Sequence, residues 1–154
     1  MSIETILKPS GVFLNISARC KREALQAIAD AASPLADQPN DIVFNTILER
    51  EQLGSTAVGD GIAIPHGKIK GLKAIMGFLT KLDAPLPFDA VDEQPVDLIF
   101  TLLAPENATA AHLKALAKVS RFLHDPKTRE ALRGAESAEA IYAIASSDMQ
   151  TNAA

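Results

Sequence analysis

Apolar side chains follow two periodicities along the first two thirds of this chain. Where they alternate or run continuously, the pattern predicts strands at residues 12–16, 62–64, 74–82 and 96–103. Where they recur at helical spacing, it predicts helices over residues 17–32 and from residue 40 or 41 to residue 54. The nearly unbroken apolar run of the last strand is typical of a strand covered on both faces.

Capping residues and prolines predict where these elements begin and end. Ser17 is expected to cap the first helix, and Ser33-Pro34 to stop it, because the residue before a proline disfavours helical geometry. Asn40 or Asp41 is expected to cap the second helix, and Gly54 to end it. The prolines within residues 83–95 confine that segment to a loop or to the edge of a sheet.

The last third of the chain has helical spacing from Thr109 onward. One apolar stripe is formed by Leu113, Leu116, Val119 and Leu123. Asp125-Pro126 and Ser137 are expected to open two further helices. Because strands and helices are mixed along the chain, we predict the α/β (mixed α+β) class, as a single three-layer α/β/α domain with a mixed β-sheet flanked by helices. The strand order does not follow from this pattern.

Length and composition set the size and the class of the molecule. The chain has 154 residues, of which 47% are hydrophobic and 22% charged, as in an ordinary globular domain. We expect one domain over residues 1–149 and a flexible tail at residues 150–154. The net charge of -4 argues against nucleic acid as a partner, because phosphate backbones are bound by clusters of Lys and Arg.

Two further observations bear on cellular location. The sequence has no apolar run of the roughly 20 residues that span a bilayer, and residues 1–5 lack the pattern of a secretory signal. Cys20 is the only cysteine, so an intrachain disulfide is impossible, which suits a reducing compartment. We therefore expect a cytoplasmic protein that does not insert into a membrane.

The segment from Arg50 to Gly67 has unusual chemistry for a connection between secondary structure elements. Its glycines let the backbone approach a ligand closely, and Ser55 and Thr56 add hydroxyl donors. A short apolar strand then leads to His66, with Gly67 leaving space beside the imidazole. The segment therefore combines a nucleophilic side chain with several donor groups.

Imidazole chemistry explains why a histidine would be used here. With an ordinary pKa of about 6.5, the His66 ring keeps one nitrogen free to attack a phosphoryl group at neutral pH. The donors that such a transfer needs around its oxygens are available locally from Arg50, Ser55, Thr56 and the glycine amides, including that of Gly67. A plainer interpretation stays open, in which His66 ends a strand and the glycines form turns.

The run Gly54-Ser-Thr-Ala-Val-Gly-Asp-Gly-Ile-Ala-Ile-Pro-His-Gly67 resembles the active-site signature of the type-2 enzyme IIA domains. These are the fructose, mannitol and nitrogen-regulatory IIA proteins of the bacterial phosphoenolpyruvate-dependent phosphotransferase system. The resemblance continues at residues 88–97, 102–105 and 112–116, so it covers nearly the whole chain.

This resemblance assigns roles to individual residues. It implies that His66 is phosphorylated on Nε2 by a histidine-containing phosphocarrier protein, that Arg50 is the active-site arginine, and that His112 lies beside the phosphorylated histidine. We expect the other nitrogen of His66 to donate to a backbone carbonyl, which fixes the tautomer. If Thr109 is the N-cap, His112 lies in a first helical turn, which favours a neutral imidazole and nearby anions. His112 also fits a core position at the start of the apolar stripe.

Two other groups of residues have alternative interpretations. A zinc site could use His66, His112 and His124, but the sequence has no closely spaced ligand pair, so we expect neither a metal nor a cofactor. His124 is explained by the favourable charge of a basic residue at a helix end. The lysines within residues 68–73 form either a docking surface or an ordinary solvated face.

The resemblance leaves two roles for such a carrier. A sugar-specific IIA passes its phosphate to a IIB domain for sugar uptake, whereas a nitrogen-regulatory IIA uses its phosphorylation state to signal to regulatory protein targets. Residues 6–14 and the Ala-rich helix after them look more like the nitrogen-regulatory members, and we expect no attached IIB domain. We therefore predict the regulatory role. A binding module without phosphotransfer and a metal hydrolase are the alternatives from other classes.

Overall fold

The computed structural model describes residues 3–153, and it describes side chains for residues 3–147. Within that part of the chain, one mixed sheet contains the strands β1 (Leu7–Ile16), β2 (Ala57–Gly59), β3 (Ile62–Ala63), β4 (His66–Ile69), β5 (Met76–Leu86) and β6 (Val96–Pro105). Their order across the sheet is β1-β5-β6-β3-β2, and β4 also pairs with β6. β5 and β6 are antiparallel, whereas β3 and β4 both run parallel to β6.

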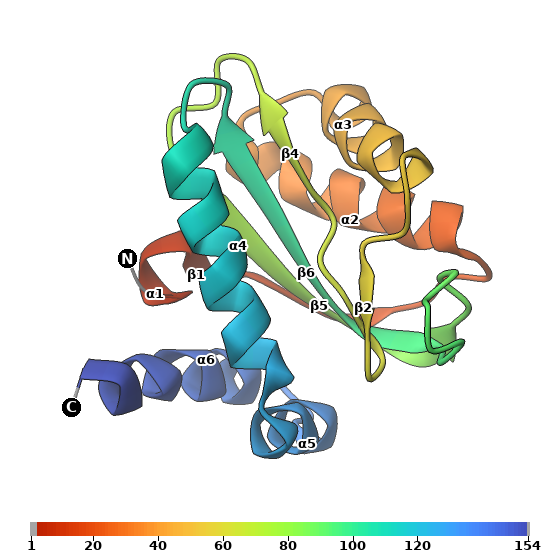
Figure 1. Ribbon diagram of the computed structural model, residues 1–154, viewed down its shortest axis with the longest axis vertical. Coiled ribbons are helices and arrows are strands. Elements are labelled where there is room, and N and C mark those ends of the chain that lie inside the picture. The colour runs from red at the N-terminus through yellow and green to blue at the C-terminus, as the bar shows by residue number, and fades with distance from the viewer. Residues whose placement is uncertain (1–2, 154) are drawn as a thin grey trace.

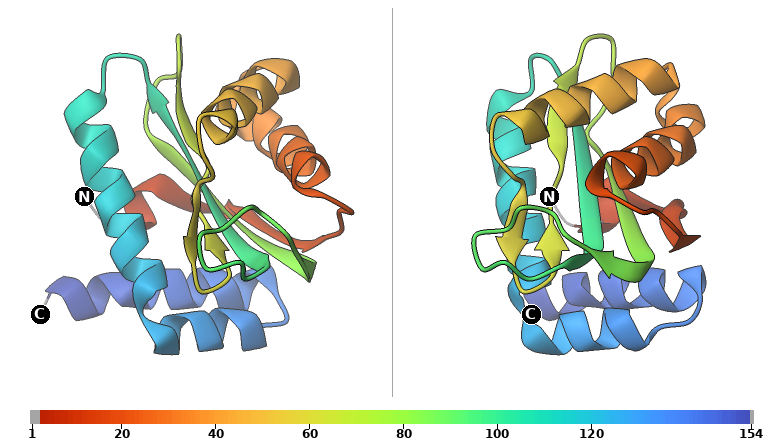
Figure 2. Two further views of the ribbon diagram at one scale, coloured as in Figure 1. Left: turned by 45° about the vertical axis from the view of Figure 1, so that its right-hand side comes forward. Right: turned by 90° about the vertical axis from the view of Figure 1, so that its right-hand side faces the viewer.

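Helices cover both faces of this sheet (Figure 1). α2 (Lys21–Ala36) and α3 (Asn40–Gln52) pack on one face. On the other face lie α1 (Ile3–Ile6), α4 (Thr109–His124), α5 (Pro126–Gly134) and α6 (Ala138–Ala153). The left view of Figure 2 shows the sheet between α2 and α3 on one side and α4 on the other. The predicted three-layer α/β/α architecture with a mixed sheet is confirmed.

β6 contributes side chains to the hydrophobic cores on both faces of the sheet. Ile99 and Leu103 belong to the core under α2 and α3, and Leu98, Phe100 and Leu102 belong to the core under α4 and α6. Because successive side chains of a strand point to opposite faces, a strand buried on both sides is apolar at nearly every position. Each fully buried aliphatic or aromatic side chain contributes about 1.5–3 kcal/mol to the stability of the fold, so the strands that pair with β6 pair with a well-packed strand.

The first predicted helix is displaced toward the C-terminus. α2 begins at Lys21, and its N-cap Cys20 is three residues after the predicted cap Ser17; the helix runs through Pro34 to Ala36. The expectation that Ser33-Pro34 stops it was wrong. A proline removes one backbone donor from the helix, but Pro34 is exposed, so solvent can satisfy the carbonyl that loses its partner. The helix ends at Asp37, which has a left-handed φ of 52°.

Other predicted boundaries are shifted by up to five residues, and the largest shift is that of the strand predicted at residues 12–16, which begins at Leu7. α3 starts at Asn40, with Pro39 as its N-cap, and ends two residues before Gly54. The strand predicted at residues 74–82 continues to Leu86, beyond the point where its pairing with β1 ends. The caps of the last two helices are confirmed, because the side chain of Asp125 accepts from the backbone N–H of Lys127, and the Ser137 hydroxyl from that of Ala140.

The buried stripe of α4 differs from the predicted one. Leu113 is 64% exposed, so its assignment to the stripe was wrong, whereas Val119 and Leu123 are fully buried. His112 and Ala115 are buried instead, which rotates the inward face of the first turns by about one residue. As a result, a histidine rather than a leucine faces the sheet at the N-terminal end of α4.

The C-terminal helix α6 packs against β1 and α1. The backbone of α6 is helical to Ala153, and residue 154 and the side chains of residues 148–154 lie outside the described part. The flexible tail expected at residues 150–154 therefore stays a prediction. No helix within residues 3–153 is long and apolar enough to cross a membrane.

Candidate functional site

His66 is the first residue of β4, at a break in the line of short strands that pair with β6. β3 pairs with the first half of β6, and β4 pairs with the second half, where His66 lies opposite Leu102. Between them, the carbonyl of Pro65 accepts from the N–H of Leu102 at 2.9 Å, and the N–H of Ile64 donates to the carbonyl of Thr56 at 3.0 Å. The backbone of the histidine is thus held on the most buried strand of the sheet.

The tautomer of the partly buried His66 ring is fixed by the chain itself. Nδ1 lies 2.8 Å from the carbonyl oxygen of Ile64, and a carbonyl can only accept, so Nδ1 carries the proton. Nε2 is then the nitrogen with a free lone pair. The predicted hydrogen bond from one ring nitrogen to a backbone carbonyl is confirmed.

Burial is the main cause that lowers the pKa of His66 below its ordinary value. The hydrogen bond to Ile64 opposes this shift, the positive charge of Arg50 adds to it, and the negative charge of Glu51 opposes it more weakly. Since the pKa lies below the ordinary value of 6.5, the ring is neutral at pH 7. A neutral ring is the form that acts as a nucleophile.

His112 lies directly beside this ring. The two ring centroids are 5.6 Å apart, with an edge-to-face angle of 72°. His112 is only 6% exposed, and its Nε2 has no hydrogen-bond partner among the described residues. Burial lowers the pKa of His112, and the charges of His66 and Lys68 lower it further. The result is a second neutral imidazole with a buried polar atom that is unsatisfied.

The position of His112 in α4 agrees with the prediction except for the cap. The N-cap is Ala108 rather than Thr109, and the N–H of His112 donates to the carbonyl of Ala108 at 2.8 Å. Thr109 is instead the first residue of the helix, and its hydroxyl accepts a hydrogen bond from Lys68 at 2.7 Å. His112 nevertheless lies in the first turn, where the helix dipole places partial positive charge.

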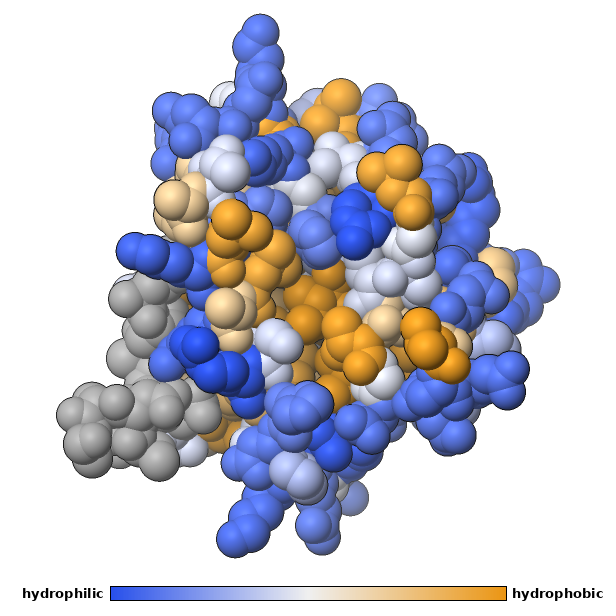
Figure 3. Space-filling view, in the orientation of Figure 1, coloured by the Kyte–Doolittle hydropathy of each residue, from blue (hydrophilic) through white to orange (hydrophobic). Residues whose placement is uncertain are grey.

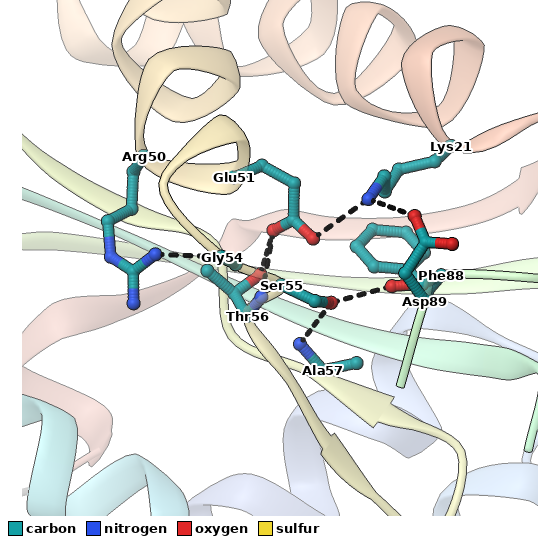
Figure 4. Close-up of polar contacts among 9 residues, drawn as sticks. All are labelled: Lys21, Arg50, Glu51, Gly54, Ser55, Thr56, Ala57, Phe88 and Asp89. Atoms are coloured by element: carbon teal, nitrogen blue, oxygen red, sulfur yellow. Dashed lines mark hydrogen bonds and ion pairs between the residues drawn. The ribbon is translucent and has the colours of Figure 1, made fainter. Parts of the chain in front are cut away.

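Arg50 is the third predicted residue that comes close to His66, from the last turn of α3. Its Nη1 donates to the carbonyl of Gly54 at 2.8 Å, as Figure 4 shows, which bends the side chain back along the loop. The rest of the guanidinium keeps N–H donors for other acceptors, since an arginine side chain has five. The structure therefore brings Arg50, His66 and His112 together from three different elements.

The hydroxyls of Ser55 and Thr56 have partners within the protein. Ser55 donates to the carbonyl of Phe88 at 2.6 Å and accepts from the N–H of Ala57, whereas the hydroxyl and the N–H of Thr56 both donate to the carboxylate of Glu51 (Figure 4). Both hydroxyl protons are thus used to hold the loop. Their predicted contact with a phosphoryl group stays a prediction and requires these hydrogen bonds to be exchanged.

Glu51 is a residue of this site that the sequence did not reveal. It is only 4% exposed, and besides Thr56 it binds Lys21 at 3.2 Å, which also binds Asp89 at 2.8 Å. The carboxylate thus links α3 to the Gly-rich loop and, through Lys21, to α2 and the loop after β5 (Figure 4). Its position between Arg50 and Gln52 at a helix end is typical of a solvated charge, whereas in the fold it is buried by its contacts with Thr56 and with Lys21, 30 residues away.

The absence of a side chain at Gly67 is explained by packing. A Cβ on Gly67 would overlap Cγ2 of Thr46, so the glycine lets α3 pack directly on β4. The space that was expected to lie beside the imidazole is therefore occupied by α3. Because side chains alternate along a strand, Gly67 faces α3 while its neighbours His66 and Lys68 face the side of α4.

Other candidate groups lie apart from this site. Among the described residues, no three or more His, Cys, Asp or Glu side chains form a group that could hold a metal ion, so His124 does not join His66 and His112. A pocket of about 410 Å³ contains Arg133, Asp97 and Asp60 but no predicted site residue. Arg133 binds both carboxylate oxygens of Asp97 and the carbonyl of Asp60, which satisfies it as a structural ion pair.

A partly buried neutral histidine with one free nitrogen, beside a second histidine and an arginine, is suited to transient attachment of a phosphoryl group. The chain belongs to the family described as phosphoenolpyruvate-dependent sugar phosphotransferase system, EIIA 2, which it matches over residues 5–147. The members of this family are phosphoryl carriers. The resemblance seen in the sequence is thereby confirmed at the level of the family.

Several relatives show which branch of the family is most similar. The chain is 45% identical to a nitrogen regulatory protein of Bradyrhizobium diazoefficiens over 144 residues, which cover 94% of each chain. The crystal structure of nitrogen regulatory protein IIA-Ntr from Neisseria meningitidis superimposes with a TM-score of 0.86 at 37% identity, covering 91% of this chain and 96% of that one. The fructose-specific EIIABC component of Bacillus subtilis is 33% identical over 148 residues, which are 94% of this chain but 23% of that protein. Similarity to nitrogen regulatory proteins is thus higher than to this sugar-specific relative.

Proposed function

We propose that this protein is a phosphohistidine carrier that accepts a phosphoryl group on Nε2 of His66 from a histidine-containing phosphocarrier protein. The observation that carries the proposal is the hydrogen bond from His66 Nδ1 to the carbonyl of Ile64, which leaves Nε2 with a free lone pair. The family to which the chain belongs supports the same chemistry.

The transfer needs no general base, because the acceptor is already deprotonated. The Nε2 lone pair of His66 attacks the phosphorus of the donor's phosphohistidine, and a P–N bond forms as the P–N bond on the donor breaks. The electrons of the broken bond return to the donor's ring nitrogen. Because Nδ1 of His66 keeps its proton, the His66 ring becomes formally cationic when Nε2 is phosphorylated, while the donor's ring, protonated on its other nitrogen, becomes neutral, so the step balances without transfer of a proton. Such a displacement is loose and in line, and the protein contributes mainly positioning and charge.

Two neighbours of His66 are suited to stabilise the transferred group. Arg50 brings a permanent positive charge close enough to lower the pKa of His66, and that charge favours phosphoryl oxygens at the same place. His112 is held neutral by burial, and an N–H at its unsatisfied Nε2 can donate to a phosphoryl oxygen. The bound group would thus satisfy a polar atom that is buried and unpaired without it.

The surface around the site suits the docking of a protein donor. Figure 3 shows apolar side chains on both sides of a hollow in the face that presents α4 and β4. Exposed apolar residues on the elements next to His66 include Leu53 after α3, Val58 in β2 and Leu113 in α4. Exposed apolar residues around a reactive group are characteristic of a protein–protein interface.

We further propose that the phosphorylation state of His66 serves as a signal to regulatory protein targets in the cytoplasm, as the names of the nitrogen regulatory relatives suggest. The second candidate is a sugar-specific IIA component that passes phosphate to a IIB domain, which the fructose-specific relative supports. Incubation of the phosphorylated protein with a purified fructose-type IIB domain separates the two candidate functions. Only a sugar-specific IIA passes its phosphoryl group to the IIB domain at a rate comparable to the rate at which it accepts that group from the phosphocarrier.

A labelling experiment tests the phosphotransfer itself. The protein is mixed with phosphoenolpyruvate, enzyme I and the histidine phosphocarrier, and its intact mass is measured. We expect one acid-labile phosphoryl group on the wild type, none on His66→Ala, and full labelling of His124→Ala as the matched control. An unlabelled wild type, or undiminished labelling of His66→Ala, would refute the proposal.

A further inference from the structure

Lys68 differs from the other lysines that follow His66 in the sequence. It lies in β4, two residues after His66, and therefore points to the same face of the sheet. Its ammonium nitrogen donates to the hydroxyl of Thr109, the first residue of α4, at 2.7 Å. Lys70 lies beyond the end of β4, so the strand does not direct its side chain to that face.

The ammonium of Lys68 is also electrostatically close to the two histidines. Its charge acts on His112, which lies three residues after Thr109 and whose ring is 5.6 Å from that of His66. An ammonium has three N–H donors, and the hydroxyl of Thr109 takes one of them. Lys68 can therefore keep its bond to α4 and still donate to an oxygen beside the rings.

We propose that Lys68 is a further phosphoryl-binding residue, whose ammonium, anchored to Thr109 at the N-terminus of α4, pairs with the oxygens of the group carried by His66. This inference rests on the proposed function. The phosphoryl group then meets two cations from different elements, Arg50 from α3 and Lys68 from β4, beside His112 from α4. The partial positive charge of the α4 N-terminus adds to the same field.

The charge of the transferred group explains why a second cation is useful. A phosphoryl group on a ring nitrogen brings up to two negative charges into a partly buried place, and a single arginine offsets only part of that charge. Lysine suits the second position because its flexible stem can follow the group as it arrives, whereas the guanidinium is a rigid fork. The pairing stabilises the phosphorylated form more than the free form.

The test is the equilibrium constant for exchange of the phosphoryl group between this protein and the phosphocarrier. That constant depends on the stability of the two phosphorylated proteins and not on how tightly they dock. We expect Lys68→Gln to shift it toward the carrier by about fivefold, which is the upper range for one exposed charge pair. For Lys68→Arg, the exchange equilibrium constant should stay within about twofold of the wild-type value. The control Lys70→Gln, which removes a lysine charge two residues away, should also stay within about twofold.

A second measurement does not depend on phosphorylation. In the free protein, Lys68→Gln should raise the pKa of His112 in an NMR titration, because the charge that helps to lower it is gone, whereas Lys70→Gln should leave that pKa unchanged.

The outcomes separate the two proposals. If the wild type takes no label, the proposed function fails. If the wild type is labelled but Lys68→Gln shifts the exchange equilibrium no more than Lys70→Gln, the role of Lys68 is refuted while the function stands. If Lys68→Gln slows labelling without changing the equilibrium, Lys68 contacts the donor protein and not the phosphoryl group, which also refutes the inference.

Discussion

Replacing Glu51 by alanine removes the buried carboxylate that holds the Gly-rich loop beside His66. The side chain is 4% exposed and accepts from the N–H of Thr56 at 3.0 Å, from the Thr56 hydroxyl and from Lys21 at 3.2 Å. Thr56 is itself only 5% exposed, so its two donors would have no access to water in the variant. Lys21 loses only one of its two ion pairs in the variant, because it keeps its contact with Asp89.

The magnitude follows from these contacts. Each buried donor left without a partner costs about 1–3 kcal/mol, and the loss of one contact of a cation that remains paired costs about 1 kcal/mol or less. These contributions add up to about 2–7 kcal/mol. Within that range we expect Glu51→Ala to lower the free energy of unfolding by about 3–5 kcal/mol, as is typical when one partner of a buried pair is removed. Glu51→Gln keeps one acceptor oxygen for Thr56, so we expect a smaller loss of about 1–2 kcal/mol.

Urea unfolding followed by circular dichroism measures these differences, with Glu49→Ala as the control on the exposed side of the same helical turn. A loss below about 1 kcal/mol for Glu51→Ala, or one equal to that of Glu49→Ala, would refute the reasoning. The titration of His66 provides a separate check. Glu51 raises the pKa of His66, so its removal should lower that pKa further in both Glu51 variants, and a rise would contradict the electrostatic account.

Three further outcomes follow from the geometry. The folded-state pKa values of His66 and His112 lie below the ordinary 6.5, so the unfolded chain binds more protons, and the free energy of unfolding should fall as the pH drops below 6.5. Urea midpoints at several pH values measure this change. The double variant His66→Gln/His112→Gln should show a smaller change than the wild type. Gly67→Ala should cost about 1–3 kcal/mol through overlap with Thr46 Cγ2, and Thr46→Ser, which removes that methyl group, should restore most of it in a thermal melt. Arg50→Gln should raise the pKa of His66 in an NMR titration and lower the phosphorylated fraction at exchange equilibrium, whereas an unchanged pKa would place Arg50 outside the site.

The arrangement of the fold was predictable where hydrophobic periodicity was strong. The apolar run of β6 and the spacing of α3 and α4 predicted elements that the structure contains to within a few residues. β2 and β4 were missed because their sequences carry no alternation, and β4 contains both a glycine and an exposed lysine. These segments are strands because they pair with neighbouring strands, and such pairing joins residues far apart in the chain.

The site was predictable in its chemistry more than in its supporting contacts. Arg50, His66 and His112 are close together as the resemblance implied, from the end of α3, the start of β4 and the first turn of α4. The hydroxyls of Ser55 and Thr56 were expected to face a ligand, but a sequence cannot tell that a buried carboxylate and a loop carbonyl compete for them. Such competition is decided by burial, which depends on the packing of α2 and α3 against the loop.

Arg50 connects the reactivity of His66 before transfer with the stability of the product after it. Its charge disfavours protonation of the ring, which keeps Nε2 available as a nucleophile, and burial acts in the same direction. Once the phosphoryl group is attached, the same charge faces an anion and stabilises it. Because burial lowers the pKa of His66 but stabilises no anion, substitutions that expose the ring and substitutions that remove Arg50 should differ. Both raise the pKa of His66, but only removal of Arg50 should weaken the phosphorylated form relative to the carrier.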